Sequence, residues 1–133
     1  LGEWVMNKVI FWQKWMDHGT DINSNQFIKT NDLYLVQPSG EEGKVGTACH
    51  EGFIGITQDN YTFIKKFHRL ATDDYPDDNC AIELYTCQHF VELETLSPKT
   101  VFMPGTSFSH EEQWILIDKM VNPKNGNEIR DLF

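Results

Sequence analysis

Apolar and polar residues alternate strictly along two short stretches near the middle of the chain, residues 80–87 and 90–95, and only two residues separate them. Period-two alternation in short runs with a tight connection is typical of paired antiparallel β-strands. The pattern of apolar and polar residues also favours strands at residues 4–16, 32–37, 52–57, 61–68, 100–103 and 108–119. Residues 4–16 fit neither the helical nor the strand period cleanly, and we favour a strand there because the downstream pattern is β throughout.

The clearest hairpin signal is the pair of apolar runs at residues 52–57 and 61–68, which flank the turn residues Gln58, Asp59 and Asn60. Strands at this spacing, with no repeats and no linker, predict an all-β fold. We expect an antiparallel β-sandwich, formed by a single domain over residues 1–133.

Composition and charge narrow the class of protein. The 133 residues, 40% of them apolar, suit one domain with one hydrophobic core. No run approaches the ~20 apolar residues that span a bilayer, and the first residues lack the features of a signal peptide, so the compartment stays undetermined. The net charge of −9 repels phosphate backbones and anionic headgroups. We therefore expect neither nucleic acid nor membrane as a partner, whereas neutral or cationic ligands are compatible.

The three cysteines, Cys49, Cys80 and Cys87, are widely spaced and form no CxxC motif. This pattern indicates neither a zinc ribbon nor a redox dithiol, and we expect at least two of them to be buried thiols. No metal or cofactor is predicted. The acidic loop at residues 71–79 is either a solvated turn or a weak cation site.

The strand at residues 90–95 supplies the first candidate site. Phe90, Glu92 and Glu94 fall on one of its faces, and Val91 and Leu93 fall on the other. At roughly 3.3 Å per residue the two carboxylates lie about 6.6 Å apart, a pair that is able to divide acid and base roles. The face is either solvated or a site. The neighbouring aromatic ring favours a sugar site, because a ring covers the apolar face of a pyranose while carboxylates accept its hydroxyl protons.

The last predicted strand supplies the second candidate. His110, Glu112 and Trp114 share one face and combine a titratable imidazole, an acceptor and a stacking ring. The alternative is a half-buried strand with Trp114 in the core. No nucleophile elbow, P-loop or dinucleotide-binding glycine motif is present, so nucleophilic catalysis has little support.

Several of these segments together resemble a known family. They are FVELETLSP at 90–98, MPG at 103–105 and H-x-E-x-W at 110–114, preceded by KVG at 44–46, FIKKF at 63–67 and YPD at 75–77. Over residues 44–117 the chain resembles an uncharacterised bacterial family allied to the aldose 1-epimerase (galactose mutarotase-like) superfamily. Residues 1–43 show no such similarity.

The resemblance implies a β-supersandwich with a carbohydrate-type cleft on its concave sheet. Epimerases of the superfamily use a Glu as base and a His as acid to open and reclose a hemiacetal, but their own His motif is absent here. A full supersandwich needs about twice this length. The chain is therefore either a minimal version or the C-terminal part of a larger protein, and exposed sheet edges would then need covering by the missing part or a second copy.

Three functions follow as hypotheses. In the first, the protein is an aldose-epimerase-like or sugar-binding protein, in which Glu92 or Glu94 takes the anomeric proton and His110 protonates the ring oxygen. Phe90, Glu112 and Trp114 would contact the sugar. In the second, it is a non-catalytic glycan-binding or accessory domain of a larger carbohydrate-active enzyme. In the third, it is a purely structural or interaction domain whose glutamates are solvated.

Overall fold

The computed structural model describes residues 9–30, 33–70 and 74–132, and within them the chain folds into three antiparallel sheets. The four-stranded sheet has the order β1-β4-β7-β8, formed by Val9–Phe11, Gly43–Thr47, Ile82–Thr86 and Val91–Thr95. The three-stranded sheet has the order β5-β6-β9, formed by Phe53–Gln58, Tyr61–Phe67 and Glu112–Ile117. The remaining sheet pairs β2 (Phe27–Lys29) with β3 (Tyr34–Val36). Two short helical turns, α1 (Pro76–Asn79) and α2 (Gly126–Arg130), complete the fold.

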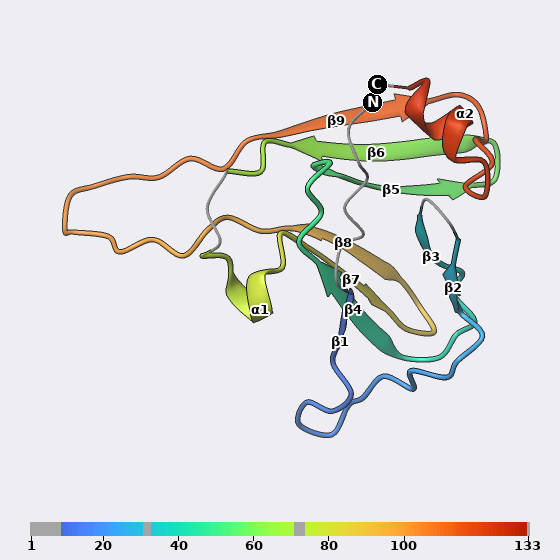
Figure 1. The fold of residues 1–133 in the computed structure, drawn as a ribbon, viewed down its shortest axis with the longest axis horizontal. Helices are drawn as coiled ribbons and strands as arrows, with labels where there is room; N and C mark the ends of the chain where they lie inside the picture. Colours follow the sequence, from blue (N-terminus) through green and yellow to red (C-terminus); the bar gives the residue numbers. More distant parts are fainter. Residues whose placement is uncertain (1–8, 31–32, 71–73, 133) are drawn as a thin grey trace.

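The three-stranded sheet lies over the four-stranded sheet in a sandwich-like arrangement (Figure 1). The two sheets are joined by a buried cluster of Phe67, Tyr75 and Ala81, against which Ile82 and Leu96 pack. Phe67 ends β6 and Ile82 begins β7, so the cluster fastens one sheet to the other. The predicted all-β antiparallel fold is confirmed.

Strand register decides which side chains leave the sandwich. Residues directly opposite one another in an antiparallel pair share a face of the sheet. Two neighbouring rows cross β4, β7 and β8 on one face: Lys44, Tyr85 and Glu92, then Gly46, Glu83 and Glu94. Residues between them along the strands, such as Leu84 and Leu93, fall on the opposite face. We call the face that bears the two rows the carboxylate face.

Both predicted hairpins are confirmed. β7 pairs with β8 from Ile82 opposite Thr95 to Thr86 opposite Val91. β5 pairs with β6 across the turn after Gln58, as the apolar runs predicted.

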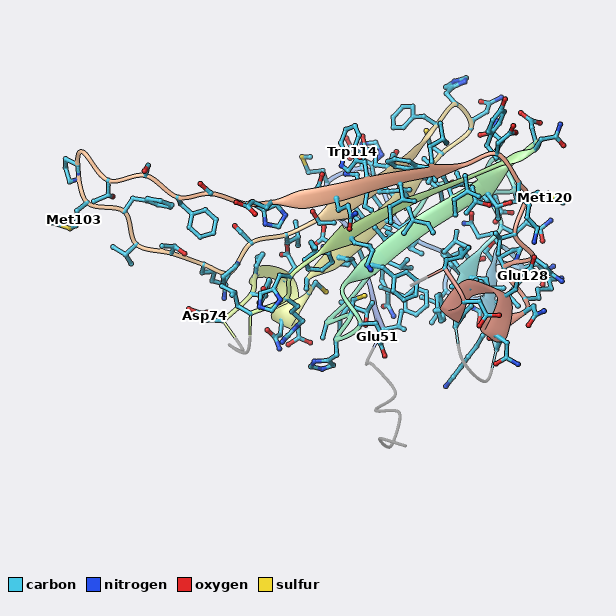
Figure 2. The ribbon with its side chains drawn as sticks, turned by 90° about the horizontal axis from the view of Figure 1, so that it is seen from above. Glu51, Asp74, Met103, Trp114, Met120 and Glu128 are labelled. Carbon is cyan, nitrogen blue, oxygen red and sulfur yellow. The ribbon has the colours of Figure 1, made fainter. Side chains whose placement is uncertain are left out.

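The predicted strand at residues 100–103 is wrong, and the last strand is shorter than the predicted 108–119. Residues 97–111 instead form a long projection, which we call the arm, between β8 and β9 (Figure 1). Met103 lies at its tip, where its carbonyl accepts a hydrogen bond from the backbone N–H of Thr106 at 3.0 Å (Figure 2). Val101 is 90% exposed. The local pattern is strand-like, but no strand in the described part of the chain pairs with the arm.

Other differences concern the first strand and three short elements. Of the strand expected at residues 4–16, β1 covers Val9–Phe11, and residues 4–8 lie outside the described part. The chain then turns through an isolated bridge between Trp15 and His18. β2, α1 and α2 were not predicted. Asp77, Asp78 and Asn79 in α1 all have positive φ, a conformation that short polar side chains tolerate better than most.

Cys49, Cys80 and Cys87 are all thiols, and Cys49 and Cys80 are buried, as expected. Burial raises the pKa of the Cys49 thiol to about 11. Within the described ranges, no helix has the length and apolar character needed to cross a bilayer.

Gly52 directly precedes β5 and closely approaches the end of β6, and this gives a stability prediction. Its φ is +72°, and a Cβ there would lie 2.5 Å from the Phe67 carbonyl oxygen. Gly40 has a similar φ of +88° but nothing within 4 Å of its Cβ position. We expect Gly40→Ala to lower the free energy of unfolding by about 1 kcal/mol through backbone strain alone, and Gly52→Ala by about 3 kcal/mol because steric overlap is added.

Urea denaturation of the two variants beside the wild type measures the difference. Equal losses in the two variants would contradict the close approach of Gly52 to Phe67.

Candidate functional site

A surface cavity of ≈210 Å³ opens on the carboxylate face. Its lining residues are Trp15, His18, Glu42, Lys44, Tyr85 and Glu92. Three of them form one cross-strand row, so β4, β7 and β8 supply the floor. Trp15 and His18 come from the turn after β1, and Glu42 directly precedes β4. We call this feature the Trp15 cavity.

Aromatic rings form much of its wall. The Trp15 ring meets the Tyr85 ring edge-on, with centroids 6.4 Å apart, and stacks on the His18 imidazole at 5.8 Å. Phe90 lies beside Tyr85, with centroids 5.9 Å apart. An aromatic wall of this kind offers apolar ring faces to a ligand.

Glu42 is held by two of these same side chains. The Tyr85 hydroxyl donates a hydrogen bond to Glu42 Oε1 at 2.6 Å, and His18 Nδ1 lies 2.8 Å from the same oxygen. The hydrogen bond from Tyr85, with the His18 contact, holds the pKa of Glu42 below its ordinary value. The same hydrogen bond raises the pKa of Tyr85. Glu42 thus fixes the orientation of two wall residues.

Lys44 forms the base of the cavity and joins two carboxylates. Its Nζ lies 2.6 Å from Glu83 Oε2 and 3.5 Å from Glu94 Oε2. The ammonium also lies 5.3 Å from the centroid of the Trp12 ring, which is within cation–π range. Burial alone would lower the pKa of Lys44, but its ion pairs outweigh burial and raise it.

Glu83 is the most enclosed carboxylate of the group, with 3% of its side chain exposed. Burial raises its pKa to about 7, although Lys44 acts in the opposite direction, and the nearby Asp77 carboxyl raises it further. Removing the Lys44 charge would leave the Glu83 carboxylate without compensation in a desolvated place, which is costly, whereas Lys44 without Glu83 would still have Glu94 at 3.5 Å.

Glu92 differs from the other carboxylates on this face. It is exposed, lies opposite Tyr85, and lines the cavity. Among the described residues it makes neither a salt bridge nor a side-chain hydrogen bond. Its carboxylate is therefore available to a ligand.

The predicted site residues fall into two groups in the structure. Glu92 and Glu94 share the carboxylate face, and Phe90 contacts Tyr85 there. His110 and Glu112 lie elsewhere, because both bond Thr95, whose side chain leaves β8 on the opposite face from Glu94. The structure therefore does not bring Glu92 or Glu94 together with His110 in one site.

Glu112 is the centre of a separate polar cluster between the sheets. It accepts hydrogen bonds from Thr95, from Lys65 Nζ at 3.2 Å, and from Trp114 Nε1 at 2.7 Å. Burial alone would raise its pKa, but these hydrogen bonds outweigh burial and lower it. Both oxygens of Glu112 are therefore engaged within the protein. Trp114 is 66% exposed on β9, the edge strand of its sheet (Figure 2).

The sequence pattern did not indicate most of the residues that line the cavity: Trp15, His18, Glu42, Lys44 and Tyr85. One signal was available, because pairing the runs at 80–87 and 90–95 places Tyr85 opposite Glu92. Trp15 and Glu42 are brought in by long-range packing, which leaves no local pattern. No group of three or more His, Cys, Asp or Glu side chains in the described chain is arranged to hold a metal ion.

Comparison of the chain with protein-family models, with curated proteins and with solved structures finds no significant match. The resemblance to galactose mutarotase-like proteins therefore stays a prediction.

The raised pKa of Glu83 predicts how stability depends on pH. The folded-state pKa of about 7 lies above the ordinary value of 4.5, so the folded protein holds this proton more tightly than the unfolded chain. The contribution of Glu83 to the free energy of unfolding is therefore fully present below about pH 4.5 and is lost as pH rises through about 7. Relative to Glu83→Gln, we expect the wild type to lose stability between about pH 5 and pH 8.

Urea denaturation of both proteins across this range measures the difference. The two proteins differ in Glu83 alone, so the comparison reports the titration of Glu83 together with its interactions with Lys44 and Asp77. A difference that stays constant or grows in favour of the wild type with rising pH would contradict the raised pKa.

Proposed function

We propose that the protein binds a sugar in the Trp15 cavity. The observation that carries the proposal is the combination of the Trp15 and Tyr85 rings with the Glu42 and Glu92 carboxylates around one opening. A pyranose has an apolar face that packs on an aromatic ring, and hydroxyl groups on its edge that donate hydrogen bonds to carboxylates. The cavity offers both kinds of contact.

The size of the cavity fits a small ligand. Its volume of ≈210 Å³ is below the roughly 300–1,000 Å³ of pockets that enclose drug-sized molecules. One sugar unit, either free or at the end of a glycan, is therefore the size of ligand we propose. The hydrogen bonds that Tyr85 and His18 make with Glu42 keep the wall in place before a ligand arrives, which lowers the entropic cost of binding.

An aldose-epimerase-like activity is the second candidate. Its support is that Glu92, a carboxylate with no internal ion pair in the described chain, and the His18 imidazole line the same cavity. A carboxylate and an imidazole are the base and acid that opening a hemiacetal requires. His18 already contacts Glu42, however, so binding without turnover is the function we favour.

Replacing a wall residue tests the sugar site. We expect Trp15→Ala to weaken sugar binding by at least about tenfold, because a ring that stacks on the ligand is lost. Trp114→Ala is the matched control: it also removes one tryptophan, but from the outer strand of the other sheet. Isothermal titration with a panel of aldoses, amino sugars and uronic acids measures the affinities, and circular dichroism checks the folding of both variants. A larger loss in Trp114→Ala would move the site to β9.

Anomeric-exchange NMR separates binding from catalysis. We expect the protein to broaden the resonances of a bound sugar without accelerating exchange between its α and β anomers. Accelerated exchange that Glu92→Gln abolishes would instead establish the epimerase-like activity. If no sugar in the panel responds in either measurement, the proposed function is wrong.

A further inference from the structure

The charges around the Trp15 cavity are strongly unbalanced. Glu42 and Glu92 line it, and Glu83 and Glu94 lie within 3.5 Å of Lys44 Nζ. Burial raises the pKa of Glu83 to about 7, so this carboxyl group is only partly ionised near neutral pH. Lys44 is the one lysine among the described residues that line the cavity. His18 adds a positive charge only when it is protonated.

The positive charge of Lys44 is already paired with carboxylates of the protein. Its ammonium lies between Glu83 and Glu94, at 2.6 and 3.5 Å, and faces the Trp12 ring. Lys44 is therefore poorly placed to bind an anionic ligand as well. Glu42 is likewise engaged by Tyr85 and His18.

Glu92 lines the cavity and makes no such internal contact among the described residues. It lies in the same row as Tyr85, so its charge and the Tyr85 ring face the same opening. An aromatic ring attracts a cation through its negative face, and a carboxylate adds direct Coulomb attraction. Rings and a carboxylate around one cavity are the arrangement that recognises an organic cation.

The net charge of the chain also favours a cationic ligand. Its net charge of −9 draws cations towards the surface and slows the approach of anions. A neutral sugar would offer Glu92 a hydroxyl hydrogen bond but no opposite charge. A uronic acid would meet uncompensated carboxylates.

We propose that the preferred ligand of the Trp15 cavity is an amino sugar whose protonated amine pairs with Glu92. This inference rests on the proposed sugar-binding function and names the chemical class of the ligand. The amine would supply the positive charge that the cavity lacks, while the pyranose ring packs on Trp15 and Tyr85.

Matched sugars test the proposal. The affinities of glucosamine, N-acetylglucosamine, glucose and glucuronate are measured by titration at about pH 6.5, where a sugar amine is protonated. We expect glucosamine to bind at least about tenfold more tightly than glucose or N-acetylglucosamine, and glucuronate to bind most weakly.

Two variants then locate the effect. Glu92→Gln removes the proposed charge partner of the amine and should weaken glucosamine binding by about tenfold. It should weaken glucose binding much less, because the amide oxygen of Gln still accepts a hydrogen bond from a sugar hydroxyl. Glu111→Gln removes the same charge from the exposed arm and should change neither affinity.

Each contrary outcome points to a different error. If glucose binds as tightly as glucosamine, or glucuronate binds best, the amine inference is wrong while the sugar site stands. If Glu111→Gln weakens glucosamine binding as much as Glu92→Gln, the preference reflects general charge attraction and the inference is also wrong. If none of the four sugars binds, the proposed function and the inference that rests on it both fail.

Discussion

The ion pair between Lys44 and Glu83 is the contact on which the carboxylate face depends. Glu83 projects from the middle of β7 into a place with almost no solvent, where an unpaired charge would be costly. Lys44 reaches it from β4 and extends to Glu94 on β8, so one ammonium links three adjacent strands. Gly46, opposite Glu83, leaves room there, since a Cβ at its position would meet the Trp12 ring at 3.1 Å. Charge pairing and side-chain size together shape the floor of the cavity.

Tyr85 connects this floor to the wall. It stands between Lys44 and Glu92 in its row, donates to Glu42, and contacts the rings of both Trp15 and Phe90. The cavity is therefore built mainly from one sheet. The turn after β1 and Glu42, the residue before β4, complete it at one side. Sites supported by strands keep their geometry better than sites made of loops alone.

Features that depend on local alternation could be predicted from the sequence. Alternation placed Glu92 and Glu94 on one face with Phe90 near them, and it identified both hairpins. It could not see that His110 and Glu112 would turn towards Thr95, because the distance along the arm hides which side of β8 they meet. It also mistook the apolar residues of the arm for a strand, since a strand needs a partner as well as a pattern. The partners of Lys44 could not be predicted either, because they depend on the register between strands that are distant in sequence.

The arm also bears on the order in which the molecule folds. β5–β6 and β7–β8 are joined by short turns, so their pairing is local. β9 reaches β6 only after the chain has passed through β7, β8 and the arm, and closing so long a loop carries an entropic cost that the hairpins avoid. The topology therefore favours docking of β9 after the two hairpins have formed. Until it docks, the edge of β6 stays open to strands from other chains, and that interval is when the protein is most exposed to aggregation.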